Sequence, residues 1–328
     1  MHDEISLAVS SGCPCGIGPE VVVGALAEFL PATPRVRVVV YGDDRALAEA
    51  ARVRRVDLRA LPRVEFRAVS SLEGRVWGAP DERAGEAQLA AVDGALDAVL
   101  RREADAIVTA PVSKYAITRS GTPFHGHTEY LAAKAGSARV VMLFAGPRLR
   151  TSLVTTHLPI AKVSGAITRE KVRESVRMTV QSMLDDFSVV CPRVAVTGLN
   201  PHAGEEGLLG DEEVEVIAPA VDEVRALYLD RAEVFGPLAA EAAFRGAKER
   251  RFDAVVAMYH DQATIASKLL DFGDAVNVTL GLPFVRTSVD HGTAYDIAGK
   301  GRAESRAMRA ALDLAAKMVM ARRPRFGS

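Results

Sequence analysis

The chain has 328 residues, of which 48% are hydrophobic and 25% charged, and its formal net charge at pH 7 is -1. This length suits one large domain or two ordinary ones, and the composition is typical of a soluble globular protein. The near-zero charge gives no electrostatic reason to expect nucleic acid as a partner. The N-terminus does not resemble a signal peptide and no apolar run reaches membrane-spanning length, so we expect a cytoplasmic protein without a membrane partner.

The chain begins with a predicted strand at 5–9, followed by a glycine-rich turn at 10–20 that opens a helix. Pro19 suits the first helical position, and Glu20 suits the positive end of the helix dipole. Such a turn could hold an anion or approach a cofactor, but it lacks the GxGxxG dinucleotide fingerprint. The sequence therefore assigns no cofactor-binding residue, and any nicotinamide site is not that of an ordinary Rossmann domain.

The three cysteines are Cys13, Cys15 and Cys191, an odd number that argues against a disulfide framework. Cys13 and Cys15 are separated by one residue, too close for an easy structural bridge. Without a second pair they also make a poor zinc site.

Strands and helices alternate through the middle of the chain. Strands are predicted at 36–41, 106–109 and 140–144, and a helix begins near Asp81. Lys114 follows the strand at 106–109. In segment 124–131, His127 or Thr128 is predicted to cap the next helix, a role that does not exclude contact with a substrate.

The second half continues the alternation. An amphipathic helix is predicted at 168–187 with Thr168 as its N-cap, followed by helices at 212–227, interrupted at Pro219, and at 303–320. The alternation predicts an α/β fold with a mainly parallel sheet. No linker or repeat is present, so a division into domains would come from a cleft and not from a flexible tether.

Three strand-like segments each lead to a histidine. The segments at 149–156, 193–199 and 254–258 run into His157, His202 and His260. A lone histidine is more often a core or surface group, but three in matching positions can converge on one divalent cation. Three protein nitrogens and an open position are typical of a catalytic metal site. No local HExxH or CxxC signature is present.

Further polar residues follow the last of these strands, in a stretch that contains several glycines and a proline. They are Lys268, Asn277, Arg286, Asp290 and His291. In parallel α/β sheets, ligands bind beyond the carboxyl ends of the strands, so this stretch is placed for chemistry. The alternative for any one polar cluster is a solvated loop.

Together these motifs resemble the 4-hydroxythreonine-4-phosphate dehydrogenase family of pyridoxal phosphate biosynthesis. The resemblance runs from about residue 12 to about residue 309, and it is carried by segments 16–20, 109–114, 126–129, 199–205, 259–262 and 277–293. Two positions depart from the family pattern: Cys13 stands where aspartate is usual, and Ala263 where glycine is common. These departures leave the substrate open more than the fold or the metal.

The resemblance implies a two-domain α/β/α fold like that of isocitrate and isopropylmalate dehydrogenases, with the active-site cleft between the domains. We place the first domain at 1–130 plus 290–328 and the second at 131–289. It also implies a homodimer with the active site at the subunit interface. The family's metal ligands correspond to His157, His202 and His260. Its substrate contacts correspond to His127, Thr128, Lys268, Asn277 and Arg286.

The implied reaction is the oxidation and decarboxylation of 4-phosphohydroxy-L-threonine to 3-amino-2-oxopropyl phosphate, with NAD or NADP as hydride acceptor. A divalent cation, Zn, Mg or Co, would lower the pKa of the reacting alcohol and then stabilise the enolate as CO₂ leaves. Arg286 and Lys268 suit a carboxylate or phosphate. Asp261 and Lys114 are both candidates for the proton acceptor.

Other functions remain open. The resemblance also leaves open the substrates of relatives of the same build, which are other hydroxy-acid phosphates, such as threonate or erythronate 4-phosphate, or cyclic dihydrodiol carboxylates. A three-histidine site could also serve an aldolase-type or hydrolytic enzyme that needs no nicotinamide. With Cys13 in place of aspartate, a catalytically silent metal-binding or ligand-binding protein is a further alternative.

Overall fold

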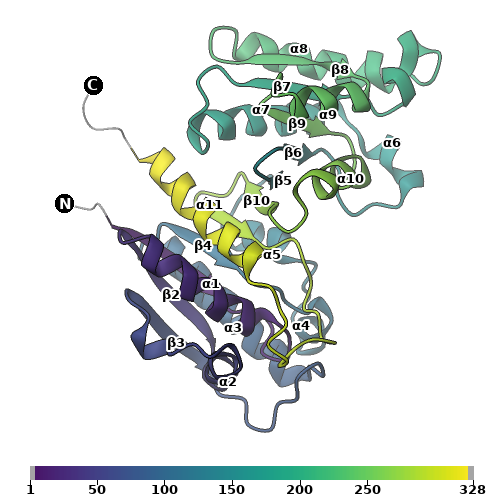
Figure 1. The fold of residues 1–328 in the computed structure, drawn as a ribbon. Helices are drawn as coiled ribbons and strands as arrows, with labels where there is room; N and C mark the ends of the chain where they lie inside the picture. The colour runs from purple at the N-terminus through teal and green to yellow at the C-terminus, as the bar shows by residue number, and fades with distance from the viewer. Residues whose placement is uncertain (1–3, 324–328) are drawn as a thin grey trace. The chain divides into compact units, whose positions relative to one another are not determined.

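A computed structural model describes residues 4–323, which form two units, each built on parallel strands (Figure 1). Unit 1 contains the described residues up to Arg139 together with Leu282–Met320. Unit 2 contains Val140–Gly281 and the described residues 321–323. The chain therefore leaves unit 1 at 139/140 and returns at 281/282, where the sequence suggested 130/131 and 289/290.

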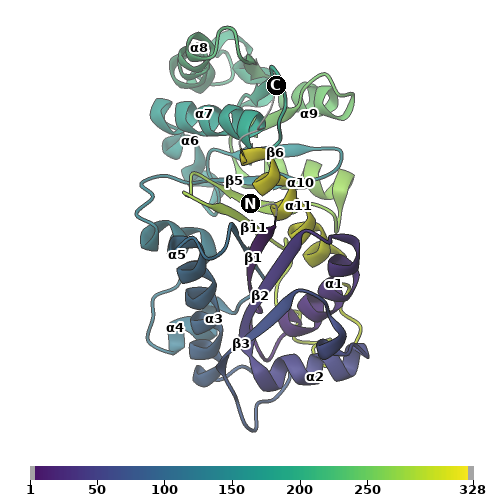
Figure 2. The same cartoon turned by 90° about the vertical axis from the view of Figure 1, so that its left-hand side faces the viewer.

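The strands of unit 1 are all parallel, in the order β3-β2-β1-β4-β11. They are β1 (Ile5–Ser10), β2 (Val36–Asp43), β3 (Val64–Ser70), β4 (Ala106–Thr109) and β11 (Val285–Ser288). The helices are α1 (Gly18–Ala32), α2 (Asp44–Arg54), α3 (Glu82–Leu100), α4 (Lys114–Arg119), α5 (His127–Lys134) and α11 (Arg306–Arg322), with a 3-10 turn η1 (Leu58–Ala60). The last two residues of α11 are assigned to unit 2. Figure 2 shows α1 and α2 on one side of β1–β3 and α3 on the other.

The strands of unit 2 lie in the order β10-β5-β6-β9-β7-β8, and only β5 runs antiparallel to its neighbours. They are β5 (Val141–Ala145), β6 (Arg150–Leu153), β7 (Arg193–Thr197), β8 (Glu233–Leu238), β9 (Ala254–Ala257) and β10 (Val276–Leu280). The α-helices are α6 (Val163–Ala166), α7 (Arg169–Asp185), α8 (Ala218–Leu227), α9 (Ala240–Lys248) and α10 (His260–Asp271). Shorter turns are η2 (Ile160–Lys162), η3 (Pro201–Gly207) and the π-helical η4 (Glu213–Ile217). The predicted α/β class with a mainly parallel arrangement is confirmed.

Several helix starts follow the sequence signals. Pro19 and Glu20 lie in the first turn of α1. Asp81 caps α3 by accepting a hydrogen bond from the Ala84 amide, and Thr168 caps α7 in the same way through the Lys171 amide. Each such cap contributes about 1 kcal/mol to helix stability.

The predicted cap of α5 is wrong. The N-cap residue is Gly126, which makes no side-chain cap hydrogen bond, and the helix begins at His127. His127 and Thr128 therefore lie inside the first turn, so neither occupies the N-cap position. Two other predictions differ in extent: β6 covers only Arg150–Leu153, and α11 begins at Arg306. Within 4–323, no helix combines the length and apolarity needed to cross a bilayer.

Candidate active site

The three strands that lead to the predicted metal-binding histidines are consecutive neighbours in unit 2. β6 pairs in parallel with β9, and β9 pairs in parallel with β7. Parallel neighbours have their carboxyl ends at the same edge of a sheet. His157 follows β6, His202 follows β7, and His260 begins α10 shortly after β9. The topology thus delivers all three histidine-bearing segments to one edge.

Two of these imidazoles lie together. The ring centroids of His157 and His260 are 5.5 Å apart, with the ring planes at 45°. Asp261 Oδ1 lies 2.8 Å from His260 Nδ1. A carboxylate at Nδ1 orients a histidine ring and leaves Nε2 as the nitrogen that binds a cation. This pair therefore fits part of a histidine metal site.

The third predicted ligand, His202, is exposed in η3. Within residues 4–323, no group of three or more histidine, cysteine, aspartate or glutamate side chains is arranged to hold a metal ion. The structure therefore brings two of the predicted ligands together, and the participation of His202 stays a prediction.

The backbone around His202 is left-handed over five consecutive residues. His202, Ala203, Glu205 and Glu206 have φ between 46° and 60°, and Gly204 lies among them at 78°. A non-glycine residue in this conformation costs about 1 kcal/mol or more, so the four together cost at least about 4 kcal/mol. Surrounding contacts must hold such a turn, and residues in this conformation cluster at functional sites.

Two other predicted contacts from unit 2 differ in their surroundings. Lys268 is exposed on α10, whereas Asn277 lies half-buried on β10. The Asn277 Oδ1 atom is buried and has no hydrogen-bond partner among the residues that the structure describes. A buried acceptor left unsatisfied costs about 1–3 kcal/mol, which a polar ligand would offset.

In unit 1, two basic side chains, Arg286 and Lys114, act electrostatically on His127, and we call these two residues the basic group around His127. Its Nε2 is buried and has no hydrogen-bond partner within 4–323. Burial, and then the positive charges of Arg286 and Lys114, hold the pKa of His127 well below its usual range. A Cβ on Gly126 would lie 2.8 Å from Glu129 Oε2 and 3.5 Å from Lys114 Nζ, so the charged ends of these two side chains lie close to the Gly126 backbone. The result is a neutral imidazole beside two cations, an arrangement suited to an anionic substrate.

Arg286 is the most buried member of this group. Its Nη2 donates a hydrogen bond of 2.8 Å to Thr109 Oγ1, at the end of β4. Burial lowers the pKa of Arg286 to about 10, while the charge of Glu129 opposes this shift. The sequence did not identify Thr109 as the partner of Arg286, although both lie in segments that carry the family resemblance. Because β4 and β11 are neighbours, the sheet itself places them together.

The glycine-rich turn after β1 is filled by the chain's own atoms. A Cβ on Gly18 would lie 2.3 Å from the Ser11 carbonyl oxygen, and one on Gly16 would lie 2.9 Å from the Thr293 carbonyl oxygen. These glycines therefore permit close packing of the protein on itself. At these two positions the close approach is therefore made by the protein itself, and the cofactor-binding residues remain unassigned.

Cys13 and Cys15 are buried in this turn as free thiols. Cys13 Sγ lies 3.5 Å from the Tyr295 hydroxyl. A hydrogen bond between the two thiols lowers the pKa of Cys13 and raises that of Cys15. At the other departure from the family pattern, Ala263 is buried in a cluster with Met142, Phe144, Leu153 and Ala257, where its methyl group contributes to the core.

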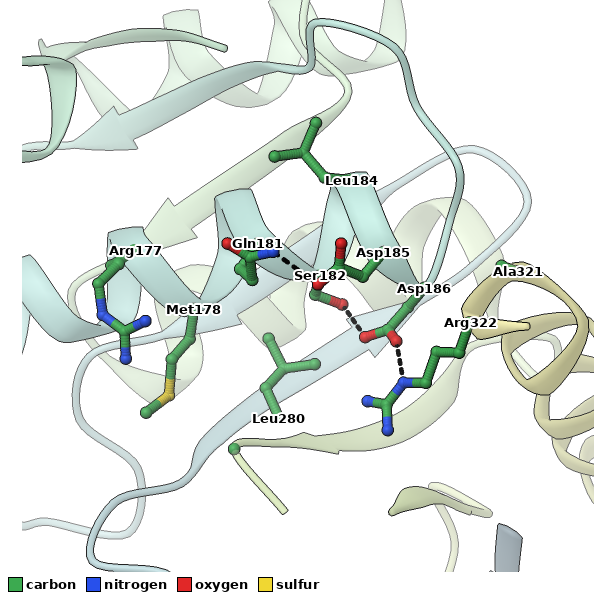
Figure 3. Close-up of a pocket in the computed structure, with 11 residues that line it drawn as sticks. Arg177, Met178, Gln181, Ser182, Leu184, Asp185, Asp186, Leu280, Ala321 and Arg322 are labelled. Carbon is green, nitrogen blue, oxygen red and sulfur yellow. Dashed lines mark hydrogen bonds and ion pairs between the residues drawn. The ribbon is translucent and has the colours of Figure 1, made fainter. Parts of the chain in front are cut away.

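A cavity of about 610 Å³ in unit 2 lies apart from the predicted site residues (Figure 3). Its lining comes from α7, the end of β10 and the end of α11. Asp186 accepts hydrogen bonds from Ser182 Oγ at 2.7 Å and from Arg322 Nε at 2.5 Å. Both arginines of the lining are already paired within the protein, Arg322 with Asp186 and Arg177 with Glu174, so neither supports an anion site in the cavity.

Comparisons with known proteins agree on one family. The family model described as "Pyridoxal phosphate biosynthetic protein PdxA" matches residues 34–315. A 4-hydroxythreonine-4-phosphate dehydrogenase from Geobacter metallireducens is 44% identical over 332 residues, covering 95% of each chain. The crystal structure of such a dehydrogenase from Klebsiella pneumoniae is similar with a TM-score of 0.83 at 34% identity, over 96% of this chain and 100% of that one.

Two more distant structures are also similar. A terephthalate 1,2-cis-dihydrodiol dehydrogenase from Burkholderia xenovorans has a TM-score of 0.68 at 30% identity, over 96% of this chain and 98% of that one. An isocitrate dehydrogenase from Methylococcus capsulatus has a TM-score of 0.55 at 16% identity, over 97% and 86% of the two chains. The second likeness concerns the fold alone, and it agrees with the predicted fold class.

Proposed function

The chain belongs to the family of pyridoxal phosphate biosynthetic protein PdxA, and we propose that it is a 4-hydroxythreonine-4-phosphate dehydrogenase. In this proposal it oxidises and decarboxylates 4-phosphohydroxy-L-threonine to 3-amino-2-oxopropyl phosphate, with NAD or NADP as hydride acceptor and a divalent metal, Zn, Mg or Co. The observation that carries the proposal is the 44% identity to the Geobacter dehydrogenase over 95% of both chains. A cytoplasmic location without membrane or nucleic-acid partners stays a prediction.

The metal would be held by His157, His202 and His260. When bound, a divalent cation supplies Lewis-acid chemistry that lowers the pKa of the substrate alcohol and stabilises negative charge on oxygen. The paired rings of His157 and His260 support this assignment. Asp261 bonds to Nδ1 of His260 and thereby orients the ring.

Substrate binding in this proposal uses five residues. From unit 1, Arg286 offers a fixed planar charge for phosphate or carboxylate oxygens. His127 stays neutral because its pKa is lowered, so its Nε2 binds by hydrogen bonding and not by charge. Thr128 adds a hydroxyl from the same turn of α5. From unit 2, Lys268 adds a flexible ammonium and Asn277 adds its buried amide oxygen.

The proton acceptor is either Asp261 or Lys114. Asp261 is exposed and already bonded to His260, which supports a role in orienting that ring. Lys114 lies in the basic group around His127. Replacing each residue separately and comparing the pH dependence of turnover would separate these roles, because only loss of the base removes a titration from the rate profile.

An apolar stripe on α10 supports the proposed homodimer. Ile265, Leu269 and, just past the helix end, Phe272 are 61%, 80% and 74% exposed. Their spacing places them on one face of the helix. Large apolar side chains exposed on one face of a helix are typical of an interaction surface. The same helix carries His260 and Lys268, so a second copy covering the stripe would lie beside proposed active-site residues.

The test is a nicotinamide absorbance assay with 4-phosphohydroxy-L-threonine and either NAD or NADP. We expect reduction of the nicotinamide that chelator abolishes and added divalent metal restores. An inert 4-phosphohydroxy-L-threonine would overturn the proposed substrate. Reduction with threonate or erythronate 4-phosphate, or with a cyclic dihydrodiol carboxylate, would then identify the alternative. The similarity to the Burkholderia dihydrodiol dehydrogenase favours testing the last of these. If no substrate reduces nicotinamide, the dehydrogenase assignment itself is wrong, and an aldolase-type, hydrolytic or ligand-binding protein remains.

A further inference from the structure

A single side chain, Gln262, joins the ends of two histidine-bearing strands. Its Oε1 accepts hydrogen bonds from the Met258 amide at 2.7 Å and from Thr197 Oγ1 at 2.8 Å. Its Nε2 donates to the Gly198 carbonyl oxygen at 2.9 Å. Met258 directly follows β9, and Gly198 directly follows β7. Gln262 thus fixes the start of the segment that leads to His202 against the start of the helix that carries His260.

The buried carboxylate of Glu213 fixes the next part of the same segment. Its Oε1 accepts from the Leu199 amide and from the Asn200 amide, both at 2.7 Å. Its Oε2 accepts from Asn200 Nδ2 at 3.0 Å. A carboxylate that accepts several N–H groups is held rigidly, because charge-assisted hydrogen bonds are stronger than neutral ones.

The fit around this carboxylate is tight on both sides. A Cβ on Gly198 would lie 2.8 Å from Glu213 Oε1, and one on Gly204 would lie 2.6 Å from Oε2. The left-handed turn of η3 therefore closes around the carboxylate, with His202 between the two glycines in the sequence. Removing the carboxylate would break its hydrogen bonds to Leu199 and Asn200 and leave a void beside Gly204.

We propose that Glu213 and Gln262 are positioning residues that preset the direction of His202 relative to His260 before a cation binds. The inference rests on the metal site of the proposed function. Its physical reason is that a ligand on a strained turn binds well only when contacts around it hold its geometry, and such supporting residues strongly influence metal affinity.

The test uses metal-stripped full-length protein, titrated with Co²⁺ or Zn²⁺ in competition with a chromophoric chelator. The variants are Glu213→Ala, Glu213→Gln and Gln262→Glu. Glu212→Gln is the matched control, because Glu212 also accepts a hydrogen bond from Asn200 Nδ2 but no backbone amide of the turn bonds to it. Amide hydrogen exchange of residues 198–207, measured without metal, reports whether the turn has loosened.

We expect Glu213→Ala to weaken cation binding about 10–100-fold and to speed exchange in the turn. Glu213→Gln keeps one oxygen for the two backbone amides, so we expect a smaller loss, and saturating metal should restore its turnover number. Gln262→Glu sets an oxygen against the Gly198 carbonyl and should fall between the two. The control should stay within about twofold of the parent.

Unchanged cation affinity in Glu213→Gln and Gln262→Glu would overturn the inference, even if Glu213→Ala fails to fold. That result would leave the proposed metal site intact, provided that the parent binds a cation and His202→Asn does not. A parent that binds no cation would instead overturn the metal-dependent function, and the positioning roles with it.

Discussion

Replacing Arg286 with methionine should separate its role in substrate binding from its effect on stability. Arg286 is 2% exposed, and its pKa falls from 12.5 to about 10. At about 1.4 kcal/mol per pKa unit, this shift means that the buried surroundings disfavour the charged form by about 3 kcal/mol in the substrate-free protein. Methionine has a similar length and carries no charge.

The gain from removing the charge is reduced by what Arg286 contributes. The hydrogen bond to Thr109 is worth about 1 kcal/mol. Glu129, which opposes the pKa shift, is exposed, so its charge remains hydrated after the replacement. We therefore expect Arg286→Met to raise the free energy of unfolding by about 1–2 kcal/mol. It should also lower kcat/KM by about 10–150-fold, because a lost charge-assisted bond costs about 1.5–3 kcal/mol.

The assay is urea unfolding of the substrate-free protein at pH 7, followed by circular dichroism, with steady-state kinetics in parallel. Arg148→Met is a control for which we expect the free energy of unfolding to change in the opposite direction. The Arg148 side chain is 61% exposed but bonds at 2.9 Å to the buried carboxylate of Asp271. Removing it leaves a buried acceptor less satisfied, so stability should fall by about 1–2 kcal/mol. If Arg286→Met is less stable than the parent, the argument from burial is refuted.

Two further predictions concern the cysteine pair and the apolar stripe. The pKa of Cys13 falls from 9.0 to about 7, so the folded state releases a proton that the unfolded state keeps between these values. The free energy of unfolding should therefore rise from pH 7 to 9 and lose this contribution as pH falls through 7. Cys13→Ser should remove the rise, and the control Cys191→Ser should keep it. A urea midpoint that does not change with pH in the parent would contradict the lowered pKa. Leu269→Glu should convert the proposed dimer to monomer in sedimentation experiments and lower activity. The control Leu229→Glu, at a similarly exposed leucine outside the stripe, should do neither. A Leu269→Glu protein that still dimerises would exclude the stripe as the interface.

The sequence predicted elements whose signals are local. β4 and β9 are short apolar runs without alternation, which is the pattern of strands buried on both faces. The start of α3 near Asp81 and the Thr168 N-cap of α7 were predictable because a capping side chain acts within three residues. The predicted cap of α5 was wrong because the true N-cap, Gly126, has no side chain that could signal it. The neighbouring polar residues His127 and Thr128 were therefore chosen instead.

The candidate site was predictable only in part. The three histidines could be singled out because each follows a strand-like segment. The contacts of Gln262 with Gly198 join positions 64 residues apart, so no local pattern reveals them. The left-handed run at 202–206 includes four non-glycine residues, which ordinarily avoid that conformation. The exposed face of α10 shares its helical spacing with a buried stripe, and the sequence alone does not distinguish the two.

The pairing of β4 with β11 also affects the order in which the two units fold during synthesis on the ribosome. β4 ends at residue 109 and β11 begins at residue 285, a separation of 285 − 109 = 176 positions. At translation rates of about 5–20 residues per second, about 9–35 s pass between the synthesis of β4 and the synthesis of β11, and during this time that edge of β4 is unpaired. The continuous segment 140–281 emerges during that interval, so its fold can mature before unit 1 is complete. Because Arg286 arrives on the closing strand, a truncated polypeptide cannot assemble the basic group around His127.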